Sequence, residues 1–192
     1  MRRNRLEGWL IYLRKLRRAD GPTLARWMSD DVVTRYFAKD SGLRGRDGKF
    51  WEAFCGDDDD NVKFGICEKT TGEIIGIVGL FSVNWRLSCA STGLVIGVTR
   101  LWRTGRAFEA KMLCLEYCFK VLKLKYVYSI VNAKNMSAIS HLRRCGYDEF
   151  NARRYSNNVC EVSEERVLTF VFRKDDWREM CKRYPLKRIR SL

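Results

Sequence analysis

The chain has 192 residues, of which 46% are hydrophobic, and a formal net charge of +14. This length suits one domain with a packed core, spanning 1–192, and the composition excludes a disordered chain. Its apolar runs are far shorter than the roughly 20 residues that span a bilayer, and the apolar stretch 9–13 is too short for a signal-peptide core, so we expect a cytoplasmic protein without a membrane partner.

The first sixty residues favour one strand followed by short helices. The strand is expected over 8–18, which is rich in Leu, Ile and Tyr. Asp20 is a candidate cap for the first helix, in whose first turn Pro22 is tolerated. Helices are expected over 20–28, 29–36 and 50–54, with a loop over 38–48. The four carboxylates at 57–60 are expected to be solvated, although they could also attract a cationic amine.

The remaining residues alternate between strand and helix patterns. Strands are expected over 62–68, 73–81, 89–98, 126–131, 147–155 and 166–173. Helices are expected over 105–122 and 137–145, and from 175 to Pro185. This order predicts an α+β fold in a single domain, with a central, mostly antiparallel sheet flanked by helices.

The cysteines do not form a metal-binding pattern. Eight cysteines are present with one histidine, His141, and the sequence contains neither a CxxC pair nor a tight His/Cys cluster. Since zinc needs a converging tetrahedral ligand set, no metal site is expected. We interpret the cysteines as reduced, buried thiols.

The segment from Trp102 to Ala110 lies between the apolar run 94–98 and a long helical pattern that begins near Gly105. A glycine-containing turn at a helix start presents unpaired backbone N–H groups at the positive end of the helix dipole. Arg103 and Arg106 add positive charge, so the turn predicts a diphosphate site. It lacks the lysine of a P-loop and the pattern GxGxxG, which argues against nucleotide hydrolysis and a Rossmann site.

A second segment, from Asn135 to Tyr147, follows the next strand and opens the next helix. Together the two segments resemble the Gcn5-related N-acetyltransferase (GNAT) superfamily, most closely its RimJ/RimL-like branch, which acetylates ribosomal-protein N-termini. Gly105 and Ala107 match the small positions of the pyrophosphate pattern [Gln/Arg]-x-x-Gly-x-[Gly/Ala]. Asn135 matches the start of the second motif, and Tyr147 stands in place of the phenylalanine that usually ends it. The resemblance covers about 8–173, which leaves a basic helix and tail over 174–192.

The resemblance implies that acetyl-CoA is the acyl donor and that no metal takes part. The implied cofactor-binding residues are Ile96, Gly97 and Val98 for the pantetheine arm, Arg103, Thr104, Gly105, Arg106 and Ala107 for the pyrophosphate, and Asn135 and Ser137 near the arm. The backbone N–H of Val98 is expected to polarise the thioester carbonyl, which makes Val98 a catalytic candidate.

The general acid and base are harder to assign. Many relatives use a glutamate on the third strand of the meander and a tyrosine in the later helix; here 89–93 holds no carboxylate and Leu142 stands at the tyrosine position. Ser140 is the remaining side-chain candidate, although Ser137 and Ser140 also suit helix-start positions, where serine usually caps. The other candidates are His141, and Asp148 or Glu149 acting through water. Trp51, Trp85 and Tyr155 are candidates for an acceptor pocket or for the core.

The resulting function is acetyl transfer to a primary amine, with a protein N-terminus as the favoured acceptor. The positive charge argues against polyamines and aminoglycosides and suits an acceptor on an RNA-rich assembly such as the ribosome. Two alternatives stay open, namely a small-molecule amine acetyltransferase and a module that binds coenzyme A or RNA without turnover. A monomer or homodimer is expected.

Overall fold

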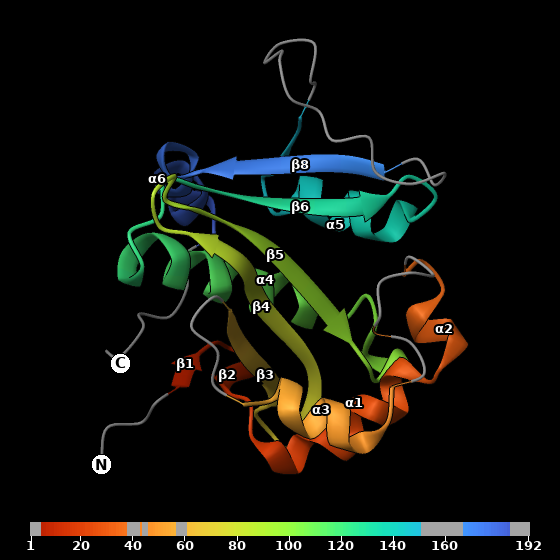
Figure 1. The fold of residues 1–192 in the computed structure, drawn as a ribbon. Coiled ribbons are helices and arrows are strands. Elements are labelled where there is room, and N and C mark those ends of the chain that lie inside the picture. Colours follow the sequence, from red (N-terminus) through yellow and green to blue (C-terminus); the bar gives the residue numbers. More distant parts are fainter. Residues whose placement is uncertain (1–4, 38–42, 44–45, 57–60, 151–166, 185–192) are drawn as a thin grey trace.

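A computed structural model describes residues 5–37, 43, 46–56, 61–150 and 167–184. Within these ranges one eight-stranded sheet has the order β1-β2-β3-β4-β5-β6-β8-β7 (Figure 1). All neighbouring strands are antiparallel except β5 and β6. The strands are β1 (Arg5–Glu7), β2 (Ile11–Lys15), β3 (Val62–Glu68), β4 (Ile74–Asn84), β5 (Cys89–Ile96), β6 (Tyr126–Asn132), β7 (Asp148–Glu149) and β8 (Val167–Arg173). The predicted α+β fold is therefore confirmed.

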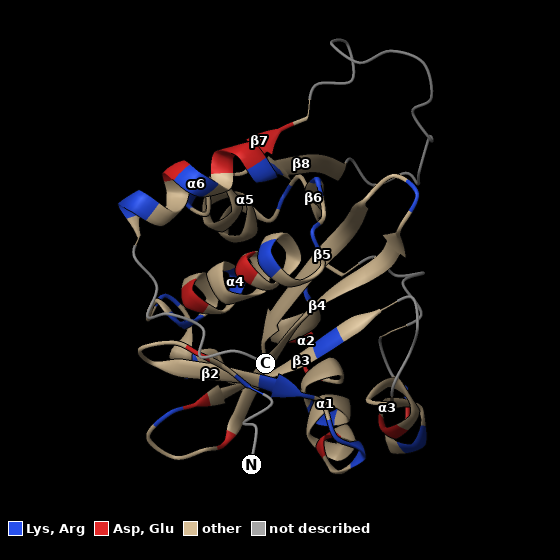
Figure 2. Ribbon diagram, turned by 90° about the vertical axis from the view of Figure 1, so that its left-hand side faces the viewer, with Lys and Arg blue, Asp and Glu red and all other residues tan. Residues whose placement is uncertain are grey.

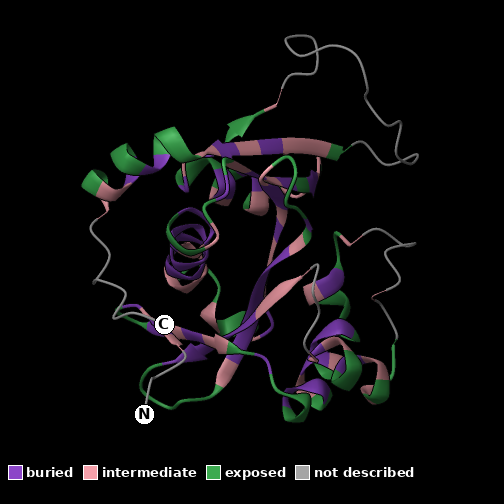
Figure 3. Cartoon of the chain, turned by 60° about the vertical axis from the view of Figure 1, so that its left-hand side comes forward, coloured by how far each residue is buried: buried purple, intermediate pink, exposed green. Residues whose placement is uncertain are grey.

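Helices cover both faces of this sheet, and an apolar core lies on each face. They are α1 (Gly21–Met28), α2 (Asp31–Thr34), α3 (Gly48–Phe54), α4 (Arg106–Glu116), α5 (Met136–Arg144) and α6 (Lys174–Arg183). The smaller core joins α1 and α3 to one face and includes Trp27 and Trp51, while the larger core contains the buried side chains of α4, α5 and α6. Buried residues run along α4 and the central strands (Figure 3). Lys and Arg lie on β2, β3, α3 and α6 rather than on a single element (Figure 2).

The N-terminal strand prediction was wrong in one respect. In place of one strand over 8–18, β1 and β2 form a hairpin with Leu6 opposite Leu13. The hairpin turn at 8–10 is held by the carboxylate of Glu109, about a hundred residues away in the chain. Because that partner is so distant in sequence, local patterning does not reveal the turn.

The helix predictions need three smaller corrections. Asp20 does not cap α1 through its side chain; its carboxylate instead accepts two hydrogen bonds from Arg14, at 2.7 and 2.8 Å. The helix expected over 105–122 ends its α-helical part at Glu116 and continues as one π-helical turn (Tyr117–Val121). The strand expected over 147–155 is present as β7 alone, because 151–155 lie outside the described residues, as do 57–60 and most of the loop expected over 38–48.

The cysteine prediction holds for the described part of the chain. Its seven cysteines are free, six are buried and Cys181 is half-buried, while Cys160 lies outside the described residues. Among the described helices, none combines the length and hydropathy needed to cross a membrane.

The feature that positions the site is the separation of β5 from β6. These two strands pair in parallel at three positions, the last of which joins Ser91 to Tyr128. Beyond that pair β5 continues beside β4, while β6 turns away with β8 (Figure 1). The backbone of β5 beyond Thr92 is therefore left without a strand partner on the side that faces β6.

Candidate active site

The turn that follows β5 is shaped by two residues with positive φ. A short 3₁₀ segment (Thr99–Leu101) leads to Arg103, with φ of 62°, and to Gly105, with φ of 88°. Gly105 is the N-cap residue of α4, in a left-handed conformation that only glycine adopts at little cost. The hydroxyl of Thr104 donates to the carbonyl oxygen of Leu101 at 2.5 Å, which braces the turn.

The first backbone N–H groups of α4 suit an anion. The first α-helical hydrogen bond of this helix runs from the N–H of Glu109 to the carbonyl of Gly105, at 3.0 Å. The N–H groups of Arg106, Ala107 and Phe108 precede that bond, and the N-cap provides no side-chain acceptor for them. An eleven-residue helix with free N-terminal donors is a recognised phosphate site, so the residues present fit a diphosphate.

The two arginines of this turn differ in their availability. Arg103 is exposed, in keeping with a role in contacting an anion. Arg106 forms a two-point pair with Glu68, from Nε to Oε2 at 2.5 Å and from Nη2 to Oε1 at 3.1 Å. The hydrogen bond to Glu68 raises the pKa of Arg106. Arg106 thus ties the start of α4 to β3, and Arg103 is the more accessible of the two cations.

The register of β4 and β5 decides which backbone groups of β5 face the open side. The N–H of Gly97 donates to the carbonyl of Ile75 at 3.0 Å. Because the backbone groups of successive residues in an antiparallel pair point alternately toward and away from the partner strand, those of Val95 also point toward β4. Leu94 and Ile96 therefore direct their N–H and C=O groups toward the open side. One of these groups has a partner already, because Nε1 of Trp102 donates to the carbonyl of Ile96 at 2.8 Å.

This geometry does not favour the predicted role of Val98. Its N–H lies 3.4 Å from the carbonyl oxygen of Ile75, on the β4 side. The backbone donors that face the open side belong to Leu94 and Ile96. Gly97 lies at the end of β5 against α1, where an added Cβ would fall 2.0 Å from Cδ2 of Trp27.

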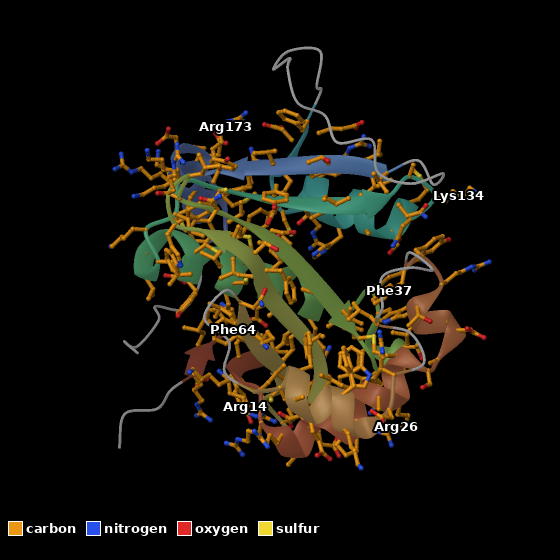
Figure 4. The ribbon with its side chains drawn as sticks, viewed as in Figure 1. Arg14, Arg26, Phe37, Phe64, Lys134 and Arg173 are labelled. Carbon is orange, nitrogen blue, oxygen red and sulfur yellow. The ribbon has the colours of Figure 1, made fainter. Side chains whose placement is uncertain are left out.

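The predicted residues of α5 lie at its start and on its exposed side. Asn135 is the N-cap residue, and its Oδ1 accepts the N–H of Ala138 at 3.1 Å. Ser137 and Ser140 are exposed, whereas Leu142, at the position where relatives carry tyrosine, is buried. Phe37, beyond α2, and Lys134, beyond β6, lie at the same side of the molecule as the C-terminal end of β5 (Figure 4).

His141 is poorly suited to act as a base. Its side chain is partly buried, with Nε2 3.7 Å from Sγ of Cys145. Burial, together with the nearby Lys111 and Arg144, lowers the pKa of His141 to about 4. A neutral imidazole with that pKa has little affinity for a proton near pH 7.

Two further expectations concern aromatic residues and metals. Trp51 is fully buried in the smaller core and so does not line a pocket, while Trp85 is exposed at the β4–β5 turn and Tyr155 lies outside the described residues. Within the described ranges, groups of three or more His, Cys, Asp or Glu side chains able to hold a metal are absent.

One polar cluster was missed by the sequence analysis. Where β5 and β6 separate, Thr92 of β5 contacts Ser129 of β6, Tyr147 beyond α5 and Lys111 of α4, all of them buried. The sequence contained one signal for it, a lysine inside the apolar stretch 110–115. The resemblance assigns Tyr147 no role beyond the place of a phenylalanine.

Comparison with known proteins identifies the family. Residues 11–148 match the acetyltransferase (GNAT) domain family, and the chain belongs to it. The chain is accordingly an N-acetyltransferase by class, in a family whose members act on amine acceptors with acetyl-CoA. A search of curated protein sequences finds no match.

Solved structures share the fold at low sequence identity. Spermidine N-acetyltransferase from Vibrio cholerae, solved with CoA and spermine, has a TM-score of 0.74 and 19% identity, with 88% of this chain and 98% of that chain covered. Apo FdhC, a nucleotide-linked sugar GNAT, has a TM-score of 0.74 and 17% identity, with 94% and 96% covered. An acetyltransferase of the GNAT family from Bacillus anthracis has a TM-score of 0.72 and 14% identity, with 89% and 99% covered.

Proposed function

We propose that this chain transfers the acetyl group of acetyl-CoA to a primary amine. The observation that carries the proposal is the open backbone edge of β5, which leads directly to the free N–H groups at the start of α4. The diphosphate of the donor would bind the N–H groups of 106–108 and the side chain of Arg103. The amides of the pantetheine arm would pair with Leu94 and Ile96, as an added strand does.

The reaction is a direct attack of the amine on the thioester. The nitrogen lone pair forms the C–N bond, the C–S bond breaks, and the thiolate takes up the proton that the nitrogen loses. A backbone N–H on the open edge, from Leu94 or Ile96 rather than from Val98, would stabilise the oxyanion. Ser140 stays a candidate only if an acceptor brings the reacting atoms to the exposed side of α5.

The acceptor we propose is the N-terminal amine of a protein, as in the RimJ/RimL-like branch. A polyamine would be disfavoured by a chain whose net charge is +14. The α-amine has a second advantage, because its usual pKa of about 8 leaves part of it neutral near pH 7, whereas a lysine amine near 10.4 stays charged.

The test measures thiol release from acetyl-CoA with three acceptors. These are a lysine-free peptide with a free N-terminus, the same peptide with a blocked N-terminus and one lysine, and spermidine. We expect release with the first peptide, and mass spectrometry should place the acetyl group on its α-amine. Faster release with spermidine would instead support a small-molecule acetyltransferase. Binding of acetyl-CoA without release for any acceptor would support a module without turnover.

The diphosphate site has its own test. Arg103→Ala should raise the KM for acetyl-CoA several-fold and leave kcat nearly unchanged, because the lost contact is the same in the ground state and the transition state. Arg100→Ala, an equally exposed arginine in the 3₁₀ segment just before the turn, serves as the matched control. Equal effects of the two variants would contradict the assignment of Arg103.

A further inference from the structure

Lys111 is a lysine buried in the middle of α4. Its side chain is 2% exposed, although lysine is almost never fully buried unless it is paired. Nζ lies 3.1 Å from Oγ1 of Thr92 and 5.6 Å from the centre of the Tyr147 ring. These neighbours carry no negative charge, so the burial of this amine calls for a physical explanation.

The hydrogen bonds around Thr92 define the direction in which protons are donated. Oγ of Ser129 donates to the carbonyl of Thr92 at 2.9 Å, so the Ser129 proton is already used. The Thr92 hydroxyl can then donate to Oγ of Ser129, 2.6 Å away, or to the carbonyl of Tyr128, 3.2 Å away. Thr92 Oγ1 therefore accepts from Tyr147 and Lys111, as a hydroxyl with two lone pairs can.

The surroundings of Lys111 favour the uncharged amine. Burial lowers the pKa of Lys111, and the titratable groups that oppose this effect are cysteines, namely Cys114, Cys118 and Cys145. His141 lies close enough for its pKa to be lowered by Lys111. The two nearest carboxylates along α4 have other partners, because Glu109 accepts the N–H groups of the β1–β2 turn and Glu116 is paired with Lys120. A charged amine in such a place would lack a carboxylate to offset its desolvation, whereas a neutral amine keeps a free lone pair.

The same amine lies where the open edge of β5 ends. Thr92 is the first residue after the last β5–β6 pair, and Leu94 and Ile96 follow it toward the diphosphate turn. Lys111 comes six residues after Gly105, which places its Cα about 9 Å along the helix from that turn. A thioester whose diphosphate binds at the start of α4 and whose arm follows the free edge of β5 would thus extend along this strand toward Thr92, the residue that Lys111 contacts.

We propose that Lys111 is an internal acyl acceptor, so that the enzyme acetylates this lysine in its own core. The inference rests on the proposed use of acetyl-CoA. The Nζ lone pair attacks the thioester carbon, the C–N bond forms as the C–S bond breaks, and one amine proton passes to the departing sulfur to give free CoA. The product amide keeps one N–H for Thr92 and no longer titrates, so the modification fixes the polar cluster in an uncharged form.

The experiment follows trideuteroacetyl label from acetyl-CoA into the full chain by peptide mass spectrometry. We expect stoichiometric label on Lys111, or an acetyl group already present there after purification, with a first-order rate that does not depend on protein concentration. Chemical acetylation of ordinary lysines rises about tenfold per pH unit below their pKa. Labelling of Lys111 should vary far less between pH 7 and 9 than labelling of Lys182, an exposed lysine of α6.

Two variants and one binding measurement separate the outcomes. Lys111→Met should remove the label while circular dichroism shows the fold intact, and Lys120→Met, which changes an exposed lysine on the same helical segment, should leave labelling of Lys111 unchanged. If calorimetry shows that acetyl-CoA binds but Lys111 remains unacetylated, or is labelled with the pH dependence of Lys182, the inference is overturned and the proposed function is untouched. If acetyl-CoA does not bind, both fail.

Discussion

A single carboxylate, that of Glu109, ties the N-terminal hairpin to the helix that begins at the diphosphate turn. Its Oε2 accepts the N–H groups of Leu10 at 2.9 Å and Ile11 at 3.2 Å, and its Oε1 accepts that of Trp9. The residue is 7% exposed. One side chain in the first turns of α4 thus accepts hydrogen bonds from three backbone donors of the β1–β2 turn.

Replacing this carboxylate by an amide should destabilise the fold. Glu109→Gln keeps one acceptor oxygen but places an NH₂ group against a backbone N–H, which leaves a buried donor unsatisfied. We expect the free energy of unfolding to fall by about 1–3 kcal/mol in denaturant titrations. Glu179→Gln breaks only the exposed pair with Lys182 and should change it by less than about 1 kcal/mol. Equal losses in the two variants would show that the hairpin turn does not depend on Glu109.

His141 should make stability depend on pH. Its pKa is about 4 in the folded chain and near 6.5 as the unperturbed value. As pH falls through this window the unfolded chain binds a proton that the folded chain does not, so stability decreases with decreasing pH. The loss between pH 7 and 4 is on the order of 3 kcal/mol at most.

The histidine contribution can be isolated with His141→Gln, which removes the titrating group. Free energies of unfolding measured at pH 7 and pH 4.5 should differ less in this variant than in the parent chain, while the carboxylates contribute equally to both. The same difference in both chains would place the pH dependence elsewhere.

The secondary structure elements differ in how far local sequence determines them. The strand predicted over 62–68 has those bounds in β3, because its residues are buried in a regular run between turn signals. The start of α4 near Gly105 was also predicted, since a glycine turn at a helix start acts locally. The helix expected over 137–145 begins one residue earlier, and its N-cap residue is Asn135 rather than a serine. The split of the first strand and the polar cluster at Lys111 depend on contacts between distant segments, so the sequence alone does not reveal them.

The junction between β5 and α1 shows how such a contact constrains one position. Gly97→Ala would place a Cβ inside the Trp27 ring, whose nearest atom is 2.0 Å away, so the strand or the helix must move. We expect a loss of about 1–3 kcal/mol from this overpacking. Thermal unfolding of both variants measures this effect. At Gly48, the first residue of α3, an added Cβ meets no atom within 4 Å, so Gly48→Ala should be neutral or slightly stabilising. An unchanged Tm in Gly97→Ala would contradict the packing at this junction.

Taken over the whole molecule, the charge favours polyanions. The net charge of +14 comes from 37 basic and 23 acidic residues, and the basic side chains of α6 include four exposed positions: Lys174, Arg178, Lys182 and Arg183. Lys and Arg are also present on β2 and β3 (Figure 2). A field spread over several elements attracts a large polyanion such as RNA without reading its sequence.

We therefore expect the chain to bind a single-stranded RNA oligonucleotide with an affinity that falls steeply with salt. The slope of log K against log salt, measured by fluorescence anisotropy, is about −0.7 for each phosphate neutralised on a single strand. Changing the four exposed basic residues of α6 to glutamine should make that slope shallower, while Asp175→Asn with Asp176→Asn, on the same helix, should not. A slope near zero in the parent chain would mean that its positive charge contributes to binding of the anionic acetyl-CoA and not to binding of RNA. The hypothesis that the acceptor lies on an RNA-rich assembly would then lose its main physical support.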